Sequence, residues 1–323
     1  MTKKFGVAII GCGQFGNKRA KAIHSNQQTQ LVGVFDPDQT RAQLLATSYL
    51  THCFASIEAL LADSTVDGVV ISSPNYLHAT QSRLALLHHK HVLCEKPAGI
   101  SELDFTDLAA VIENKVSQTN WQYGYNHRFF EPVLQIKQWL NQAAVGAIET
   151  VDMTIASGRN KNSSPWFMDP QQSGGGTLID NGHHLIDLLL WLLPGQWQVS
   201  AAATELLIDH QVESSATVSL NQNAIDARIT SKWQTAQHYL SILVKGERGT
   251  IVITDEAAIL ETTTTTQKEF PLVPGLAVQA EINDWLKNST LQPGLNALQN
   301  LTTASKIYDL ITTAYTFSEH DSC

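Results

Sequence analysis

The sequence predicts an α/β protein: an N-terminal, doubly wound parallel sheet followed by an α+β domain whose open sheet is largely antiparallel. Two observations lead to this prediction. As far as residue 125, short apolar runs alternate with helical patterns, whereas after Gly146 strand patterns follow one another with turns between them. The chain has 323 residues, more than one ordinary domain needs. We therefore expect two domains, residues 1–125 and 126–323.

The first domain is predicted from short runs that are mostly apolar. These runs are Phe5–Ile10, Leu31–Phe35, Val66–Ile71, His91–Cys94 and Gln122–Tyr125. Helical patterns lie between them near Phe15–Ser25, Pro37–Ser48, Tyr76–His88 and Glu102–Asn114. Strands that are apolar on both faces and alternate with helices are typical of a parallel sheet covered by helices on each side.

The second domain begins with a helix near Pro132–Asn141 and then changes to consecutive strands. The predicted strands are Gln198–Leu207, Glu213–Asn221, Ala224–Trp233, Tyr239–Val244 and Thr250–Thr254. A helix from Leu295 to about Phe317 ends the chain. In Tyr239–Val244 the second face is only partly polar, which indicates a face that is either solvated or used for contact between subunits.

Composition excludes several classes of protein. The net charge is −9 and no basic run occurs, which argues against a nucleic-acid partner. The longest apolar run, 188–193, is too short to cross a bilayer, and the start of the chain leaves no room for a signal peptide. Cys12, Cys53, Cys94 and Cys323 lack metal-type spacing. These features predict a reduced, cytoplasmic protein with no metal site.

A glycine-rich turn follows the first apolar strand. Its residues are Gly11-Cys12-Gly13-Gln14-Phe15-Gly16, and a helical pattern begins inside it. In this context the first glycine permits a tight turn, the second lets a pyrophosphate approach, and the third lets helix and strand pack closely. The turn therefore predicts dinucleotide binding at a helix N-terminus. The alternative is a glycine turn with a structural role only.

Asp36 lies 20 residues after Gly16, at the end of the second strand. A carboxylate there accepts hydrogen bonds from a ribose hydroxyl pair and repels a 2′-phosphate, so NAD is favoured over NADP. No arginine follows until Arg41, which weakens the case for NADP further. Asp38 nearby is interpreted as a carboxylate at a helix N-terminus.

Further candidates for cofactor binding lie where the next strands end. Ser73, Pro74, Asn75 and His78 follow one strand, and Glu95 and Lys96 follow the next. Ligands of such sheets bind beyond the carboxyl ends of the strands. The alternatives are a capping role for Asn75, a packing role for His78 and an ion pair between Glu95 and Lys96.

The segment Gly174–Asp187 carries a second chemical pattern. Three glycines at 174–176 leave the backbone free to approach a ligand, and a helix is predicted after them. Asp180 and His184 are four residues apart and so share one helix face, whereas His183 is rotated by about 100°. An imidazole beside a carboxylate is a candidate general base. The alternatives are a helix N-terminus with a chance histidine pair and, less favoured, a metal site.

These motifs occur together and in order, with Tyr123-Gly124-Tyr125-Asn126-His127-Arg128-Phe129 between them. In this the chain resembles the glucose-fructose oxidoreductase / inositol 2-dehydrogenase / rhizopine-catabolism (Gfo/Idh/MocA) family. The resemblance implies a Rossmann domain, a nicotinamide cofactor, reversible oxidation of a sugar or polyol hydroxyl, and a dimer or tetramer formed through the open sheet. It implies Lys96, Asp180 and His184 as catalytic residues. His183 departs from the family, which usually has an apolar residue there.

Four further residues are candidates for substrate contact. Tyr125 and Asn126 follow the first domain, and Arg159 and Trp166 belong to a polar stretch that suits stacking on a sugar or binding of an anionic group. A solvated loop is the alternative for Arg159 and Trp166. Arg128 is interpreted as a strut between the domains, and Asp187 as a residue that orients His184.

The sequence thus predicts an NAD-dependent dehydrogenase that acts on a CH–OH group of a sugar, an inositol-like cyclic polyol or a sugar derivative. Two alternatives stay open. One is a non-catalytic NAD-binding sensor or regulator, and the other is an NAD-dependent glycosidase of the same family.

Overall fold

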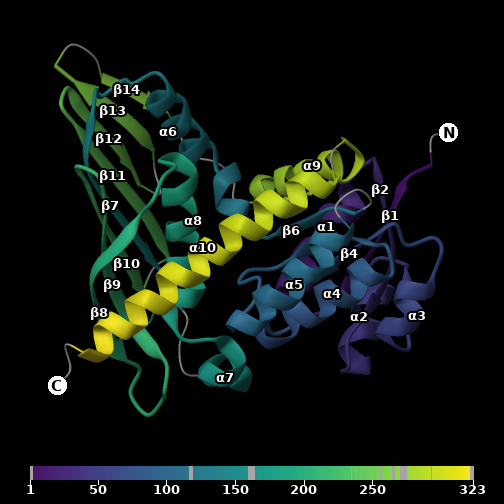
Figure 1. Cartoon of the computed structure of the whole chain (residues 1–323). Helices are drawn as coiled ribbons and strands as arrows, with labels where there is room; N and C mark the ends of the chain where they lie inside the picture. The colour runs from purple at the N-terminus through teal and green to yellow at the C-terminus, as the bar shows by residue number, and fades with distance from the viewer. Residues whose placement is uncertain are drawn as a thin grey trace. The chain divides into compact units, whose positions relative to one another are not determined.

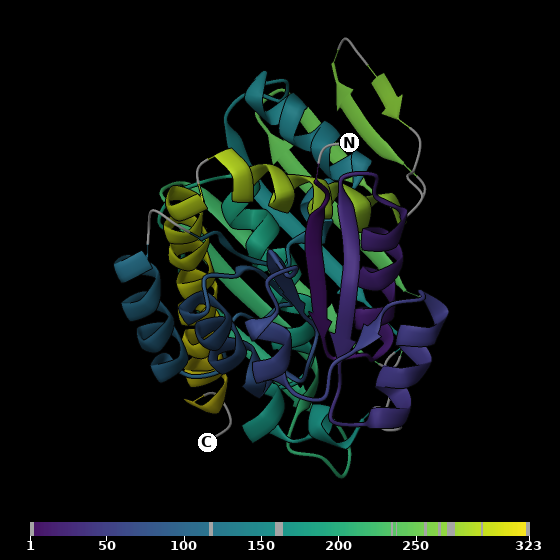
Figure 2. The ribbon, with the colours of Figure 1, turned by 90° about the vertical axis from the view of Figure 1, so that its right-hand side faces the viewer.

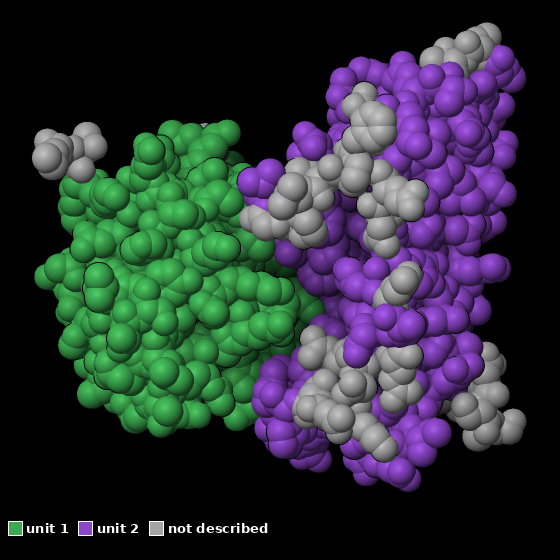
Figure 3. Space-filling model, turned by 180° about the vertical axis from the view of Figure 1, so that it is seen from behind, with its two compact units in different colours: residues 1–124, 278–305 green, residues 125–277, 306–323 purple. Residues whose placement is uncertain are grey.

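The computed structural model describes residues 3–115, 119–158, 164–233, 235–236, 238–254, 257–263, 266–269, 275–291 and 293–320. The chain divides into two compact units (Figure 3). Unit 1 comprises Met1–Gly124 and Val278–Ser305, and unit 2 comprises Tyr125–Ala277 and Lys306–Cys323. The division into domains at residue 125 stays a prediction. These units differ from it mainly because residues 278–305 group with the N-terminal part.

Unit 1 is built on a six-stranded parallel sheet with helices on both faces (Figures 1 and 2). The strand order is β3-β2-β1-β4-β5-β6. The strands are β1 (Phe5–Ile10), β2 (Thr29–Phe35), β3 (His52–Cys53), β4 (Gly68–Ile71), β5 (His91–Cys94) and β6 (Trp121–Tyr123). The helices are α1 (Gln14–Ser25), α2 (Gln39–Ser48), α3 (Ile57–Ala62), the 3₁₀ turn η1 (Asn75–Leu77), α4 (His78–Leu87) and α5 (Glu102–Lys115). The predicted doubly wound parallel sheet is confirmed.

The helix α9 (Gly275–Leu291), absent from the sequence prediction, completes the core of unit 1. Its residues Ile282 and Trp285 are fully buried and belong to the same apolar cluster as strand β1. A Cβ atom added at Gly68 would lie 2.9 Å from the Trp285 ring, so this position of β4 needs a glycine. The edge of the Trp285 ring also meets Phe5, with 5.6 Å between ring centroids.

Unit 2 contains an eight-stranded sheet in the order β14-β13-β12-β11-β7-β10-β9-β8. Its neighbouring strands are antiparallel except for the parallel pair β7 and β10. The strands are β7 (Ile148–Ala156), β8 (Gln198–Leu206), β9 (Glu213–Gln222), β10 (Ile225–Lys232), β11 (Tyr239–Gly246), β12 (Gly249–Ile253), β13 (Ala258–Thr262) and β14 (Thr266–Glu269). The last two form the hairpin at the sheet edge in Figure 2. The predicted open, largely antiparallel sheet is confirmed.

Unit 2 also contains helical segments. They are η2 (Asn126–Phe129), α6 (Glu131–Asn141), η3 (Pro165–Met168), α7 (Pro170–Ser173), the π-helix η4 (Leu178–Gly182), α8 (His183–Leu192) and the C-terminal part of α10 (Pro293–His320). Of these, α6, η4 and α8 contact its sheet. In β11, Leu240, Ile242 and Val244 are buried, whereas Ser241 and Leu243 on the other face are half-buried. The strand therefore presents one face to the core, as its alternation predicts.

No helix within the described part of the chain has the length and apolar character required to cross a membrane.

Candidate active site

The glycine turn Gly11–Gly16 in unit 1 has the geometry that dinucleotide binding requires. Gly11 has a φ of +96°, and a Cβ atom there would lie 2.6 Å from the carbonyl of Ser72. A Cβ at Gly16 would lie 2.0 Å from the Gly11 oxygen, which shows how closely α1 approaches β1. At Gly13, by contrast, an added Cβ would meet nothing within 4 Å. The first and third glycines are thus fixed by protein packing, while the second faces open space.

Helix α1 begins at Gln14, directly after this open position. Its N-cap residue is Gly13, and no side chain in the described structure caps the first turn. The first backbone N–H groups are therefore available to a ligand, and they carry the positive end of the helix dipole. This arrangement fits a pyrophosphate.

Asp36 follows β2 and is 4% exposed. One carboxylate oxygen accepts a hydrogen bond from the backbone N–H of Cys12 at 2.8 Å, and the other accepts from that of Asp38 at 2.9 Å. These bonds tie the carboxylate to the glycine turn and leave further lone pairs on each oxygen for a ribose. The Asp38 side chain accepts from the N–H of Arg41 at 3.1 Å, so its interpretation as a helix N-terminal carboxylate is confirmed.

Arg41 changes the charge at this edge. Its guanidinium lies 3.6 Å from Asp36 and 3.4 Å from Asp38, although its own side chain is 52% exposed. Arg41 was expected to lie too far from Asp36 to favour NADP. The first turn of α2 nevertheless brings it beside the carboxylate at the expected ribose position.

His78 joins the two loops that follow β4 and β5. Its Nδ1 lies 2.7 Å from the Pro97 carbonyl and its Nε2 lies 2.8 Å from the Ser73 carbonyl. The ring is 1% exposed, and burial lowers the pKa of His78. A neutral imidazole has one N–H and donates to one of these carbonyls at a time. His78 therefore positions the two loops and has almost no surface to offer a ligand.

The other residues of the loop after β4 have defined positions. Ser73 donates its hydroxyl proton to Gln81 Oε1 at 2.6 Å. Pro74 precedes η1, and the buried Asn75 is the first residue of that 3₁₀ turn. The alternative that Asn75 caps the following helix is wrong, because Leu77 occupies the N-cap position of α4.

Lys96 follows a strand end that is fixed by buried charge. Glu95 accepts a hydrogen bond from Arg19 Nε at 2.7 Å, and Arg19 also pairs closely with Glu281 of α9. The Arg19 side chain is 3% exposed. This triad fixes the backbone directly before Lys96, which is itself half-buried.

Asp180 of unit 2 lies in the π-helix η4, where the sequence predicted an ordinary α-helix. Its Oδ2 accepts a hydrogen bond from the Trp233 indole at 3.1 Å, and the residue is 7% exposed. Trp233 packs on Phe167 with 5.5 Å between ring centroids. Sequence reasoning missed Trp233, because it lies 53 residues from Asp180 and its only mark is an indole at the end of a strand.

The glycines before this π-helix are needed for packing within the protein. Gly174 and Gly175 have φ values of 86° and 144°. A Cβ at Gly175 would lie 2.1 Å from the Tyr315 hydroxyl, and one at Gly176 would lie 2.1 Å from the Glu213 carbonyl oxygen. The prediction that these glycines admit a ligand is therefore wrong for Gly175 and Gly176, because side chain and backbone of the same unit fill that space.

Glu213 is a buried carboxylate that holds the start of η4. Its oxygens accept hydrogen bonds from the N–H groups of Gly176 at 2.9 Å and Leu178 at 2.7 Å, and from the Tyr315 hydroxyl at 3.0 Å. Burial raises the pKa of Glu213, while these hydrogen bonds act in the opposite direction. Sequence reasoning also missed this residue, which reads as the polar start of a strand.

The two adjacent histidines of α8 lie in different surroundings. His183 is 3% exposed, whereas His184 keeps part of its surface accessible. Their ring centroids are 6.5 Å apart with an angle of 82° between the planes. The His184 ring packs against His127 with 3.9 Å between centroids, and Nδ1 of His127 lies 3.1 Å from Asn126 Oδ1. His127 belongs to the motif Tyr123–Phe129, but the sequence predicted no role for it.

Asp187 and Arg128 form a two-pronged ion pair within unit 2. Arg128 Nε donates to Oδ2 at 2.9 Å and Nη2 donates to Oδ1 at 2.5 Å. The guanidinium also lies over the Tyr125 ring, 4.3 Å from its centroid. The carboxylate predicted to orient His184 is thus engaged by Arg128, and the residue predicted to join the domains braces η2 to α8.

The remaining substrate candidates divide into three cases. Tyr125 is 6% exposed and stacks on Phe129 at 5.9 Å, and Asn126 is half-buried. Trp166 packs on Phe167 in an apolar cluster, with 4.9 Å between ring centroids. Arg159 lies outside the described residues. Within the described ranges, no group of three or more His, Cys, Asp or Glu side chains is arranged to hold a metal.

The hydrogen bonds that Glu213 accepts predict a loss of stability when this carboxylate is removed. Glu213→Ala leaves two buried N–H groups and the Tyr315 hydroxyl without their acceptor, at about 1–3 kcal/mol for each donor. We expect urea unfolding of the full chain to show a loss of about 3 kcal/mol or more, with smaller losses for Glu213→Gln and Tyr315→Phe. The exposed Glu205→Ala is the matched control and should change the unfolding free energy by less than about 0.5 kcal/mol. Equal effects of Glu205→Ala and Glu213→Ala would contradict the assignment.

The raised pKa of Glu213 predicts a pH dependence. Between the ordinary glutamate pKa near 4.3 and the higher value in the folded protein, the folded state binds more protons than the unfolded state. The stability contributed by Glu213 therefore falls as pH rises through this window. We expect the unfolding free energy of the wild type, relative to Glu213→Gln, to increase as pH is lowered from about 8 to about 5. A difference that does not change with pH would show that burial leaves this carboxyl unperturbed.

Both halves of the chain match models of the same protein family. Residues 5–120 match the family described as "Oxidoreductase family, NAD-binding Rossmann fold", and residues 133–252 match the GFO/IDH/MocA C-terminal domain. The solved structure of KijD10, a 3-ketoreductase from Actinomadura kijaniata in complex with NADP and TDP-benzene, is similar in fold. Its TM-score is 0.85 at 17% identity, over 97% of this chain and 98% of the other.

Two curated relatives are similar in sequence. Glucose-6-phosphate 3-dehydrogenase of Bacillus subtilis is 29% identical over 58% of this chain and 53% of its own length. Inositol 2-dehydrogenase of Rhizobium meliloti is 30% identical over 66% of this chain and 61% of its own. The matches thus span little more than half of each relative. The two family matches together cover most of the described fold, and the chain belongs to the Gfo/Idh/MocA family of oxidoreductases.

Proposed function

We propose that this protein is a dehydrogenase that transfers a hydride between NAD and a secondary hydroxyl or ketone of a sugar, a cyclic polyol or a sugar derivative. Membership of the family supports a nicotinamide-dependent oxidoreductase. The printed activities of the two curated relatives, on glucose 6-phosphate and on inositol, support the substrate class. The chain also retains Lys96, Asp180 and His184, the three residues that the family motifs mark as catalytic.

The observation that carries the proposal is the contrast between the two histidines of α8. His183 is buried, whereas His184 keeps accessible surface and lies beyond a π-helix that holds Asp180 on the Trp233 indole. π-helical turns are rare and occur frequently at functional sites. We assign His184 as the base that removes the proton of the substrate hydroxyl, and Asp180 as an acceptor for a neighbouring hydroxyl or a partner in proton transfer.

His127 limits the charge that His184 carries in this role. The two rings are 3.9 Å apart, so protonating both places two positive charges in contact. The hydrogen bond between His127 and Asn126 fixes the orientation of the second ring. We therefore infer that His127 positions His184 and disfavours simultaneous protonation of the pair.

Lys96 is assigned to the substrate oxygen. Its ammonium donates a hydrogen bond to that oxygen and stabilises the negative charge that develops as the proton leaves. The ion triad of Arg19, Glu95 and Glu281 fixes the backbone from which Lys96 extends. Asn126 and Tyr125 are kept as candidate substrate contacts, together with Trp166 and Arg159.

The cofactor is assigned to the glycine turn of unit 1. The open position at Gly13 and the uncapped start of α1 would receive the pyrophosphate, and Asp36 would accept the ribose hydroxyls. When bound, the nicotinamide accepts or returns the hydride. We propose NAD as the preferred form because Asp36 is nearly buried and opposes a 2′-phosphate. Relatives of this fold include complexes with NAD and complexes with NADP, and Arg41 provides the positive charge that tolerance of NADP would require.

Self-association is proposed through the outer face of the unit 2 sheet. This face carries Ser241 and Leu243 of β11 beside Thr154 of β7 and Thr230 of β10, all half-buried. The same face also carries Asp152 and Arg228, which pair in register. Such a mixed face suits contact with a second copy in a homodimer or homotetramer. A cytoplasmic location is proposed with it.

The function is tested by screening inositols, aldoses and sugar acids with NAD at the absorbance of NADH. Net formation of NADH from a free polyol or sugar is the expected result, because a dehydrogenase releases its reduced cofactor. Cleavage of a glycoside without net NADH would instead identify the NAD-dependent glycosidase. NAD binding without turnover of any compound would identify the sensor or regulator.

The catalytic assignment predicts the effect of three substitutions. Lys96→Ala and His184→Ala should each lower kcat by about 10²–10⁴-fold while NAD still binds, because a positioned acid–base group contributes about that factor. Steady-state kinetics and NAD titration measure the two effects separately. His183→Leu is the matched control, since it fills a buried position with an apolar side chain. It should retain at least about a tenth of the activity, and a collapse equal to that of His184→Ala would show that the other imidazole is the base.

The ribose assignment predicts a change of cofactor preference. Asp36→Ala should weaken NAD binding and raise the ratio of kcat/KM for NADP over NAD by about tenfold or more, because it removes both an acceptor and a repelling charge. Asp38→Ala is the matched control, since Asp38 is half exposed and caps α2. An unchanged preference in Asp36→Ala, or an equal change in Asp38→Ala, would contradict the assignment.

A further inference from the structure

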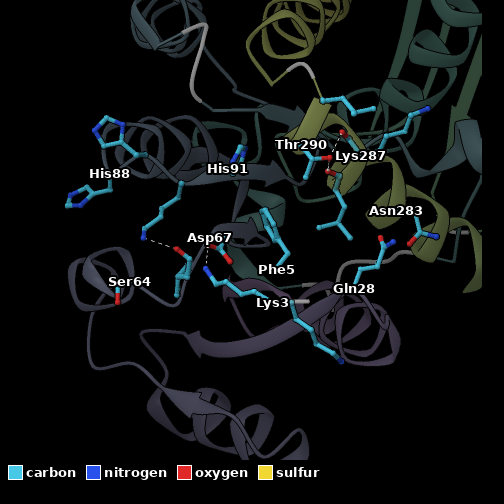
Figure 4. A pocket seen from close by; sticks show the side chains of 16 residues that line it. Lys3, Phe5, Gln28, Ser64, Asp67, His88, His91, Asn283, Lys287 and Thr290 are labelled. Atoms are coloured by element: carbon cyan, nitrogen blue, oxygen red, sulfur yellow. Dashed lines mark hydrogen bonds and ion pairs between the residues drawn. The ribbon is translucent and has the colours of Figure 1, made fainter. Parts of the chain in front are cut away.

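Unit 1 has a hollow at the edge of its sheet opposite the glycine turn (Figure 4). Its volume is about 850 Å³. The surrounding residues lie at the amino ends of β1, β2, β4 and β5, and α9 forms the remaining wall. The glycine turn, in contrast, follows the carboxyl end of β1. The hollow shares no lining residue with the proposed cofactor site, and its size suits a small-molecule ligand.

The lining of this hollow is strongly basic in a chain whose net charge is −9. It includes Lys3, Lys4, Lys90 and Lys287 together with three histidines, against the one carboxylate of Asp67. That carboxylate is already engaged, because it accepts from Lys3 Nζ at 3.0 Å and from the N–H of Gly6 at 2.8 Å. In the described part of the chain, no carboxylate pairs with the other three lysines. Within the described residues, Lys4 and Lys287 therefore have no ion-pair partner, whereas the charges of Asp67 and Asp63 act on Lys90 without forming an ion pair with it.

Two of the polar groups are fixed in place by the surrounding backbone. Lys90 Nζ donates to the carbonyls of Asp63 at 3.0 Å and Val66 at 2.8 Å, which leaves its third proton for another acceptor. His91 Nδ1 accepts from the N–H of Asn120 at 3.0 Å, so the neutral ring carries its proton on Nε2 and is a donor there. A ligand therefore meets two preformed donors, which lowers the entropic cost of binding.

The hollow also has an apolar side. The Phe5 ring packs on Trp285 and lies 5.7 Å from the His91 ring. Leu286 and the exposed Leu291 of α9 line the same cavity. An aromatic ring and aliphatic side chains next to clustered lysines suit a ligand that joins an organic group to several negative charges.

We propose that this hollow binds a small organic polyphosphate, such as a nucleoside triphosphate, at a site separate from the dinucleotide turn. A triphosphate chain carries enough charge to compensate Lys4, Lys90 and Lys287, and lysine binds phosphate as a point charge. Phe5 with Leu286 covers the organic part. The proposal does not depend on the proposed dehydrogenase activity, because the two sites use different residues.

The test is isothermal titration of the full chain with ATP and with inorganic tripolyphosphate, both without magnesium, in the presence and absence of saturating NADH. We expect each to bind once per chain with an affinity that NADH does not change, and ATP to bind about threefold or more tightly, since a buried apolar contact adds affinity. Competition by NADH would place both ligands at the dinucleotide turn and overturn the proposal. Equal affinities would overturn the assignment of the organic group to the apolar side.

Two double variants distinguish ATP binding in the hollow from nonspecific electrostatic attraction to the protein surface. Lys4→Gln combined with Lys287→Gln should weaken ATP binding by about tenfold or more, because two charge-assisted contacts are removed. Lys21→Gln combined with Lys245→Gln changes the net charge equally at exposed positions elsewhere. This control should alter the affinity less than about twofold.

A third variant should bind ATP more tightly. Tighter binding cannot result from damage to the fold. Asp67→Asn keeps an acceptor for Gly6 but removes the negative charge and releases Lys3. It should tighten ATP binding by about threefold. The proposal would be overturned if the wild type showed no saturable ATP binding in the millimolar range. It would also be overturned if the Lys4/Lys287 variant and Asp67→Asn bound ATP with the same affinity as the control pair.

Discussion

Buried carboxylates that accept backbone N–H groups fix the candidate binding regions of both units. In unit 1, Asp36 binds the N–H groups of Cys12 and Asp38 and so ties the end of β2 to the glycine turn. In unit 2, Glu213 binds those of Gly176 and Leu178 and fixes the start of the π-helix. An acceptor of this kind is costly to remove, because each N–H would then be buried without a partner.

The glycines show that one residue type serves two different physical needs. At Gly13 a Cβ atom would meet open space, so the missing side chain leaves room for a ligand. At Gly175 and Gly176 a Cβ atom would overlap Tyr315 and Glu213, so the missing side chain leaves room for the protein itself. The local sequence cannot distinguish these cases, because the atoms that fill the space come from residues 37 to 140 positions away along the chain.

Elements with a continuous apolar run or a strong helical period were predictable, and β1 and β5 begin and end at the predicted residues. The two-residue strand β3 is too short to show a pattern. Strand β7 and helix α9 were missed, although β7 alternates buried and half-buried residues and α9 spaces Ile282, Trp285 and Leu286 on one face. That α9 packs into the core of unit 1 depends on contacts with β1 and β4, which spacing along α9 does not reveal.

In the candidate site, the residue types followed from motifs while their environments did not. The i, i+4 argument for Asp180 and His184 assumed a regular α-helix, but Asp180 lies in the wider π-helix and His184 in the α-helix that follows. The direction of the Asp180 carboxylate is set by the Trp233 indole, and the start of the π-helix is set by Glu213. His184 is instead placed by the regular helix α8 and by the His127 ring. The carboxylate and the imidazole are therefore positioned by different neighbours, so their relative placement is a property of the packed unit and not of the spacing between them.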